Sequence, residues 1–313
     1  MPEDVVSQPP RPDKKRKRYY TRARVMRRLF LLFGLYLGMC AAIAWLSVYP
    51  HRGGVADRPG IGDIKFDNLT FHSADGTRLS GWFIPATRSP KGVVVLCHGV
   101  DGNRGGMLEP AMMLHKHGYA ALVFDFRARG NSDGAHSTLG WKETDDLLAA
   151  IGAVKNRPDL RGLTIGVMGH SMGGAVALMG AARSSDVKAV IAESAFAQLD
   201  HAVHNHFSDI FGSIGPVFEY PSRWFGERLI GRSSTDISPV SVISRIAPRA
   251  VFLIQDSDDT LCPQSESREL FQACGEPKSL WIVPHARHIQ AIYLQHDEFE
   301  RRIVAFFDEH IKG

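Results

Sequence analysis

Short apolar runs of strand length alternate along most of the chain with stretches in which apolar residues recur at helical spacing. We interpret these runs as strands: Lys65–Phe71, Arg78–Ile84, Gly92–Cys97, Ala120–Phe126, Leu163–Met168, Lys188–Ala192, Ala250–Gln255 and Ser279–Val283. The first two flank Asp75-Gly76, which is typical of a hairpin turn, and the later runs are continuous in Val, Ile and Leu, as in strands buried on both faces. Helical spacing is found over Leu108–His117, Lys142–Lys155, Met172–Arg183, Gln264–Cys274 and Asp297–Ile311. This alternation predicts an α/β fold with a mostly parallel sheet of about eight strands and helices on both faces.

An aromatic-rich stretch from Ala197 to about Val242 interrupts the alternation. It shows no clear strand pattern and contains six large aromatic residues: Phe207, Phe211, Phe218, Tyr220, Trp224 and Phe225. We interpret it as a small helical insertion that serves as a lid.

A run of 20 uncharged residues lies near the N-terminus, from Leu29 to Val48. As a helix it would be about 30 Å long, enough to cross the hydrocarbon core of a bilayer. Trp45 and Tyr49 suit the interface at one end. We favour a signal anchor. A signal peptide cleaved at Ala42-Ile43-Ala44 is the alternative, and a buried core helix is disfavoured because no polar face interrupts the run.

Charge is distributed unevenly along the chain. Its 313 residues are 44% hydrophobic and 22% charged, which excludes a disordered chain, a collagen and a disulfide scaffold. Residues 1–28 hold ten of the 37 basic and three of the 33 acidic residues, so the formal charge of +4 arises in this tail and the remainder is slightly acidic. The body therefore lacks the basic surface of a nucleic-acid-binding protein. By the positive-inside rule the tail is cytoplasmic and the body lies across the membrane, periplasmic or extracellular in a bacterium; binding of the tail to RNA or anionic lipid is the alternative.

These features divide the chain into four parts. Residues 1–28 form the basic tail, 29–49 the anchor, 50–62 a Gly/Pro-rich linker, and 63–313 the folded domain with its insertion at about 197–242. None of the four cysteines forms a C-x-x-C pair, so we expect no zinc site. Whether Cys262 and Cys274 pair stays open at this point.

A G-x-S-x-G motif follows the strand Leu163–Met168 directly and precedes a helical pattern. It reads Gly169-His170-Ser171-Met172-Gly173. A serine on such a sharp strand-to-helix turn has strained backbone angles, and the neighbouring glycines Gly169 and Gly173 leave room where a Cβ would clash. The motif predicts that Ser171 is a nucleophile held at the positive end of the following helix.

A serine nucleophile needs a base and a residue that orients it. His288 follows the last predicted strand by a short loop, which places it at the same sheet edge as Ser171; His285 in that loop is the alternative. The orienting acid is expected after the penultimate strand, where three aspartates compete: Asp256, Asp258 and Asp259. We expect His201, His204 and His206, in the insertion, to serve packing rather than metal binding.

The oxyanion of an acyl-transfer reaction needs two backbone N–H donors. One follows the nucleophile and belongs to Met172, and the other comes from the loop after an early strand. That loop is Cys97–Arg104, whose glycines permit close approach of the backbone. Val100 is the expected second donor.

These motifs together resemble those of the serine α/β-hydrolase family. Asp125–Ser132 is similar to the family's D-x-R-G-x-G-x-S loop, and Asp259–Pro263 is similar to its D-x-x-V-P, which selects Asp259 as the acid. The His288 loop is similar to the family's terminal G-H motif, with Arg287 in place of the glycine. The resemblance covers residues 63–311, and the branch looks like membrane-anchored relatives of monoacylglycerol-lipase-type and prolyl-oligopeptidase-type hydrolases.

The resemblance implies an α/β-hydrolase fold and a cofactor-free, metal-free Ser-His-Asp mechanism. We expect cleavage of a carboxylic ester, small or lipid-like, by Ser171, His288 and Asp259. Amidase or peptidase, thioesterase and acyltransferase activities use the same residues and stay open, as does the less favoured possibility of a non-catalytic scaffold. The membrane is the expected partner, nucleic acid is not, and the oligomeric state is left open.

Overall fold

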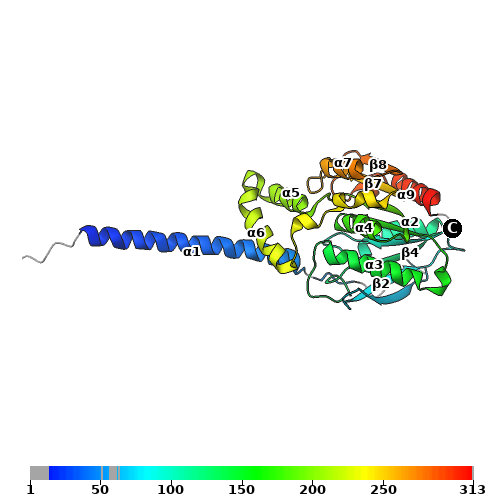
Figure 1. Ribbon diagram of the computed structural model, residues 1–313, viewed down its shortest axis with the longest axis horizontal. Helices are drawn as coiled ribbons and strands as arrows, with labels where there is room; N and C mark the ends of the chain where they lie inside the picture. The colour runs from blue at the N-terminus through cyan, green and yellow to red at the C-terminus, as the bar shows by residue number, and fades with distance from the viewer. Residues whose placement is uncertain (1–13, 51, 56–61, 63, 312–313) are drawn as a thin grey trace, which may run out of the picture.

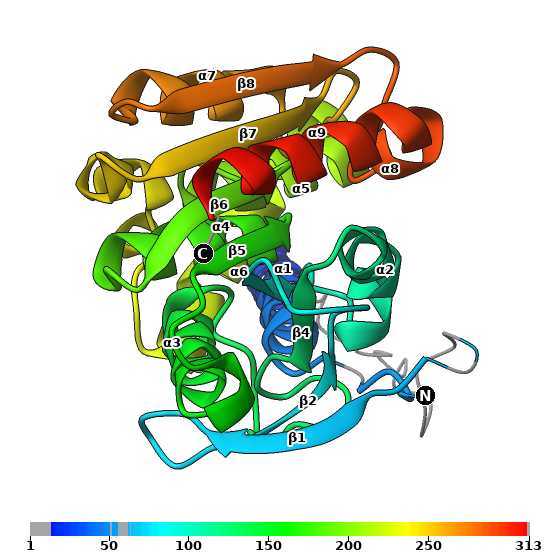
Figure 2. The same ribbon diagram turned by 90° about the vertical axis from the view of Figure 1, so that its right-hand side faces the viewer.

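The computed structural model describes the chain apart from residues 1–13, 51, 56–61, 63 and 312–313, and it describes no side chains for residues 14–20. The first 13 residues of the basic tail and about half of the predicted linker thus lie outside the described residues. The centre of the fold is one eight-stranded sheet in the order β1-β2-β4-β3-β5-β6-β7-β8 (Figure 2). The strands are β1 Asp67–His72, β2 Arg78–Ile84, β3 Val93–Cys97, β4 Ala120–Asp125, β5 Ile165–His170, β6 Val187–Glu193, β7 Ala250–Asp256 and β8 Lys278–Val283.

The pairing of the strands brings several strand ends to one edge of the sheet. Strands β1 and β2 are antiparallel, and β2 pairs antiparallel with β4, whereas all pairs from β4 to β8 are parallel. Cys97 at the end of β3 pairs with Gly169 of β5, and His170 pairs with Glu193 at the end of β6. The carboxyl ends of β3, β5, β6, β7 and β8 therefore share the edge where α/β folds place their sites.

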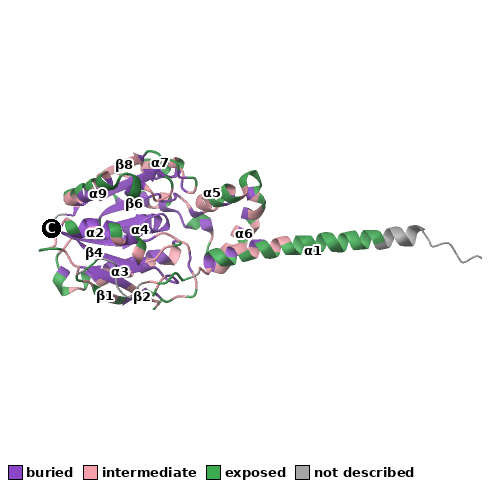
Figure 3. Ribbon diagram, turned by 180° about the vertical axis from the view of Figure 1, so that it is seen from behind, coloured by how far each residue is buried: buried purple, intermediate pink, exposed green. Residues whose placement is uncertain are grey.

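Two layers of helices cover the sheet, and each layer buries its own apolar cluster against one face. The first layer contains α3 (Trp141–Lys155), α4 (Met172–Arg183) and α7 (Gln264–Ala273), and the second contains α2 (Leu108–Lys116), α8 (Ala291–Leu294) and α9 (His296–His310). The central strands of the sheet, such as β3, β4 and β5, are buried between them (Figure 3), whereas the edge strand β1 is mostly exposed. The predicted α/β fold is confirmed, and each predicted strand agrees with the structure to within two residues at either end.

The insertion forms two helices outside the layers, α5 (Leu199–Phe211) and α6 (Gly215–Ile230). We call residues 199–230 the lid. Short 3-10 turns follow it at Ser234–Asp236, Pro239–Ser241 and Ile243–Ile246 and lead back to β7. In Figure 1 the lid projects from the body beside the end of the first helix.

That first helix, α1, runs from Lys14 to Val48 and stands out from the body (Figure 1). Its portion from Thr21 to Val48 is long and apolar enough to cross a membrane. Most of this portion is exposed, but its last turns dock on the body, where the carbonyl of Val48 accepts a hydrogen bond from the Ser137 N–H at 2.9 Å and the Val48 side chain joins the core (Figure 3). The predicted uncharged span is thus part of a longer helix that is attached to the domain.

Candidate active site

Ser171 lies at the turn between β5 and α4. Its φ is +55°, a left-handed conformation that a residue with a side chain seldom adopts. A Cβ at Gly169 would collide with the backbone of Gly173, and a Cβ at Gly173 would collide with the carbonyl of Cys97. The two motif glycines are therefore required because the turn folds onto itself and onto the end of β3.

The structure brings Ser171, His288 and Asp259 into one hydrogen-bonded chain. His288 Nε2 lies 2.9 Å from Ser171 Oγ, and His288 Nδ1 lies 2.7 Å from Asp259 Oδ2. The other carboxylate oxygen of Asp259 accepts the N–H groups of Leu261 and Cys262 at 2.9 and 2.8 Å. Asp259 is held rigidly by these two donors, and it in turn holds the imidazole.

The competing aspartates have other partners. Asp256 is buried behind the site and accepts hydrogen bonds from Ser194 Oγ at 3.0 Å and the Gln290 N–H at 3.1 Å. Asp258 is exposed and accepts from Ser257 Oγ at 2.7 Å. Of the three aspartates in this loop, Asp259 alone has its carboxylate hydrogen-bonded to His288, which is the geometry that an orienting acid needs.

The competing histidines also lie elsewhere. His285 is exposed, and its N–H donates to Ser257 Oγ at 2.8 Å. In the lid, His201 pairs with Glu266 at 3.1 Å and His204 with Glu219 at 2.8 Å. The first contact links the lid to α7 and the second links α5 to α6, as a packing role requires, whereas His206 is exposed and lines the cavity that holds Ser171.

The loop after β3 approaches the nucleophile closely. A Cβ at Gly99 would lie 3.4 Å from Ser171 Cβ. Val100 and Met172 line the same cavity as Ser171. Met172 is the first residue of α4, a position where the N–H group has no carbonyl partner inside the helix. The structure therefore brings both residues to the cavity that Ser171 lines, and the role of their N–H groups stays a prediction.

His98 fixes this loop, a role that the sequence analysis missed. Its Nε2 accepts the N–H of Phe126 at 3.1 Å, so Nδ1 carries the proton and donates to the Gly99 carbonyl at 2.7 Å. Burial lowers the pKa of His98 to about 4, which keeps the ring neutral in this arrangement. The signal in the sequence was the His-Gly pair at the end of β3.

A buried acid–base pair lies behind Ser171. His170 Nε2 is 3.0 Å from Glu193 Oε2, and both side chains are almost fully buried. Burial lowers the pKa of His170 to about 4, with the nearby His288 adding to the effect. Burial and the neighbouring Asp256 raise the pKa of Glu193 well above its ordinary value. Both shifts favour the uncharged form of the partner concerned.

The loop after β4 is held by buried charges. Arg127 pairs with Asp146 at 2.6 Å and with Asp75 of the β1–β2 hairpin at 2.7 Å. These acids raise the pKa of Arg127 and keep it charged despite burial. The Asp125 carboxylate accepts the N–H groups of Arg104 and Asn131, each at 2.8 Å. The motif residues here support the site rather than enter it.

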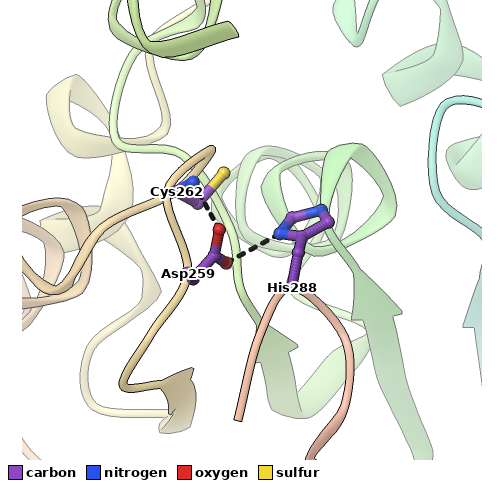
Figure 4. A group of neighbouring side chains, drawn as sticks. All are labelled: Asp259, Cys262 and His288. Carbon is purple, nitrogen blue, oxygen red and sulfur yellow. Dashed lines mark hydrogen bonds and ion pairs between the residues drawn. The ribbon is translucent and has the colours of Figure 1, made fainter. Parts of the chain in front are cut away.

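One group of metal-type ligands is found among the described residues: Asp259, Cys262 and His288, whose ligand atoms lie within 4.8 Å of one another. Figure 4 shows that these are residues of the hydrogen-bonded chain, with Asp259 between the other two. Both oxygens of Asp259 already accept hydrogen bonds, and burial raises the pKa of Cys262, which disfavours the thiolate that a metal binds. The donors do not fit a metal site.

The cavity beside Ser171 has a volume of about 240 Å³ and mostly apolar walls. Residues of the body line one side and residues of the lid another, including Phe207 of α5 and Ile230 of α6. Residues of α1 complete it: Ile43, Ala44, Ser47 and Val48. All four cysteines are buried free thiols, so Cys262 and Cys274 form no disulfide in this structure.

A nucleophile elbow after the fifth strand of an eight-stranded, mostly parallel sheet, followed in the chain by Asp259 and His288, defines an α/β hydrolase. Residues 88–245 match the model of the family described as serine aminopeptidase, S33, and the chain belongs to this family.

Similar proteins agree with this assignment. The chain is 32% identical over 246 residues to the Mycobacterium tuberculosis protein Rv2307c, which covers 78% of this chain and 79% of that protein. It is 24% identical over 293 residues to polyketide transferase ATR5 of Stachybotrys chlorohalonatus, covering 77% and 98%. Among solved structures, the Pyrococcus furiosus esterase Pf2001 matches with a TM-score of 0.72 and 26% identity, covering 84% of this chain and 98% of the esterase.

Proposed function

We propose that the protein is a membrane-anchored serine hydrolase that cleaves carboxylic esters through an acyl-enzyme. The observation that carries this proposal is the continuous chain of contacts from Ser171 Oγ through His288 to Asp259, at 2.9 and 2.7 Å. Each of the three residues has the geometry that its role requires.

The first step forms the acyl-enzyme. The Asp259 carboxylate accepts a hydrogen bond from the Nδ1–H of His288, which leaves Nε2 free to take the proton of Ser171 as Oγ attacks the ester carbonyl. The N–H groups of Val100 and Met172 hold the oxyanion, and His288 then gives the proton to the leaving alcohol. Water, deprotonated by the same histidine, releases the acid and restores Ser171.

The cavity and a structural neighbour support an ester with an apolar acyl group. The apolar walls beside Ser171 would stabilise a hydrocarbon chain by about 0.8 kcal/mol for each buried methylene. The Pyrococcus furiosus protein Pf2001, 26% identical, is an esterase.

We further propose that α1 anchors the enzyme with its body outside the cytoplasm. The support is the apolar stretch Thr21–Val48. Many basic residues lie just before this stretch and in its first turns. Such residues favour the cytoplasmic side. A catalytic domain that follows the helix directly is then held against the opposite surface of the membrane.

Transfer of the acyl group to an alcohol instead of water is the second candidate function. The similarity to polyketide transferase ATR5, over almost the whole length of that protein, favours it. An acyl-enzyme on Ser171 would pass its acyl group to whichever hydroxyl reaches the carbonyl first. Added alcohols would then accelerate release of the acyl group and appear in the product.

The test uses the full chain in mild detergent, wild type and Ser171→Ala, with p-nitrophenyl esters of increasing chain length and the corresponding anilides. We expect ester turnover and fluorophosphonate labelling in the wild type, and neither in the variant. Faster turnover of anilides than of esters would make the enzyme an amidase. A folded wild type that shows neither turnover nor labelling would refute the proposed hydrolase function and favour a non-catalytic scaffold.

A further inference from the structure

One face of α1 is built to meet the lid. Cys40, Ala44 and Val48 are spaced by four residues, so they lie on the same side of the helix. They are 0%, 4% and 1% exposed, whereas most of the described helix is open. A Cβ at Gly226 of α6 would lie 4.0 Å from Ala44 Cβ. Small residues therefore bring α1 and α6 close together, as in helix pairs within membranes.

The same turns of α1 form a wall of the cavity that holds Ser171. Ala44 and Val48 line it, and so do Ile43 and Ser47. Ser47 is exposed on the helix surface, and its hydroxyl donates to the Ile43 carbonyl of its own helix at 3.0 Å. The packing of α1 against α6 therefore does not depend on the Ser47 side chain. The proposed anchor thus contributes to substrate binding as well as to location.

Contacts farther along α1 fix the depth of the lid. Tyr36 packs against Phe218 of α6 with ring centroids 5.9 Å apart, and its hydroxyl donates to the Val217 carbonyl. Tyr36 precedes Val48 by twelve residues, which is about 18 Å along a helix. If Val48, docked on the body, marks the membrane surface, the end of the lid that touches Tyr36 lies within the leaflet on that side.

The lid presents an apolar surface at this depth. Five large apolar side chains of the lid are between 52% and 60% exposed: Ile210, Ile214, Val217, Tyr220 and Trp224. Such a patch marks a surface that another phase or molecule covers. Because α6 is packed along a helix that we take to cross the bilayer, the occupant is lipid. The exposed carboxylate of Asp209 would be costly in hydrocarbon, so we place Asp209 toward the headgroups and the 214–217 end deepest.

We propose that α1 and the lid together form a lipid-facing entrance to the active site, through which an ester whose acyl chain resides in the bilayer reaches Ser171 along the wall of α1. This inference rests on the proposed function and adds the substrate class: membrane lipids rather than water-soluble esters. The acyl chain leaves one apolar environment for another, and the ester group alone enters the polar end of the site.

The first test makes the cavity narrower at the wall that α1 forms. The full chain in phosphatidylcholine nanodiscs hydrolyses p-nitrophenyl palmitate and p-nitrophenyl butyrate, and the ratio of the two kcat/KM values is measured. Ser47→Trp is expected to lower the palmitate-to-butyrate ratio about tenfold or more, as excluding about two buried methylenes would. Leu46→Trp is the matched control, because Leu46 is exposed and does not line the cavity; its ratio stays at the wild-type value.

The outcomes separate this inference from the proposed function. If the wild type hydrolyses neither ester and is not labelled by a fluorophosphonate, the proposed function fails. If it hydrolyses both and Ser47→Trp leaves the ratio unchanged, α1 is no part of the acyl site and only the inference fails. Fluorophosphonate labelling of Ser47→Trp shows that the variant has folded.

The second test measures the depth of the lid directly. A fluorophore attached at Val217→Cys, in the full chain in phosphatidylcholine vesicles, is expected to be quenched by lipids that carry a nitroxide on the acyl chain. The control is Lys188→Cys, because Lys188 is exposed near the start of β6, at the opposite edge of the sheet from the site; its label responds to aqueous iodide instead. Quenching of the Val217 label by iodide would place the lid in water. Protection from both quenchers would mean that a second copy covers it, and either result overturns the lipid-facing entrance.

Discussion

The contact between Asp259 and His288 gives the sharpest prediction for the proposed mechanism. In Asp259→Asn, the N–H groups of Leu261 and Cys262, now 2.9 and 2.8 Å from one oxygen, hold the amide oxygen in that place. The new NH₂ group then faces His288 Nδ1 and donates to it, so the ring must carry its proton on Nε2. That proton points at Ser171 Oγ, and the base is lost.

The expected loss follows from this tautomer change. Because the shape of the site is preserved, the effect falls on kcat. The same substitution in a serine-protease triad lowers kcat about 10⁴-fold, which corresponds to about 5 kcal/mol of transition-state stabilisation. The assay is p-nitrophenyl butyrate turnover by the full chain in detergent, with fluorophosphonate labelling as a second readout. Asp258→Asn in the same loop is the matched control, since Asp258 is exposed and its carboxylate accepts a hydrogen bond from Ser257 rather than from His288. A loss of less than about tenfold in Asp259→Asn would refute the proposed role of the carboxylate.

Two further predictions concern stability, measured by thermal unfolding of the full chain in detergent. Gly173→Ala places a methyl group against the Cys97 carbonyl and is expected to cost at least about 1–3 kcal/mol, whereas Gly152→Ala in α3, where a Cβ meets nothing within 4 Å, is expected to stabilise by up to about 1 kcal/mol; equal shifts would contradict the close approach. His98→Gln is expected to lower Tm at pH 7, and the difference from wild type shrinks at pH 5. The pKa of His98 is about 4 in the folded protein and 6.5 in the unfolded chain, so the unfolded chain takes up the proton first as pH falls. The contribution of His98 to the free energy of unfolding therefore decreases between pH 6.5 and pH 4, and at pH 5 it is smaller by about 2 kcal/mol. A difference that does not change with pH would mean that His98 is not held neutral.

The fold could be predicted because the sheet is buried on both faces. Strands such as Val93–Cys97 and Ala120–Asp125 consist of buried residues throughout, so they stand out as continuous apolar runs. The ends were less certain. Strand β5 continues to His170, two residues beyond its apolar run, because the strand must reach the turn that carries Ser171. The four-residue helix α8 was missed because it is too short to show a period.

The candidate site was predictable in part. Chain order and spacing predicted Ser171, Asp259 and His288, and the structure places them in contact. Their catalytic roles, and those of the Val100 and Met172 N–H groups, stay predictions. The buried groups His98 and Glu193 could not be predicted, because it is burial in the fold that lowers the pKa of His98 and raises the pKa of Glu193.

The contribution of α1 to the cavity could not be predicted from hydrophobic pattern. An uninterrupted apolar run has no polar side, so nothing in it shows which face contacts protein and which contacts lipid. The spacing of Cys40, Ala44 and Val48 was the available signal, because small or compact residues every four positions favour close helix packing. That signal is weak in a single sequence, and it became visible only with α6 beside it.

The docking of α1 also bears on whether the N-terminal segment can be cleaved off. A peptidase that cut after Ala44 would have to reach a bond whose residue is 4% exposed in the folded protein. A chain cut there before folding would lack Ile43 and Ala44 and would open the side of the cavity that they close. Under the proposed function, release from the membrane and loss of this wall would be the same event, so we expect a cleaved form to have a more open site suited to smaller esters.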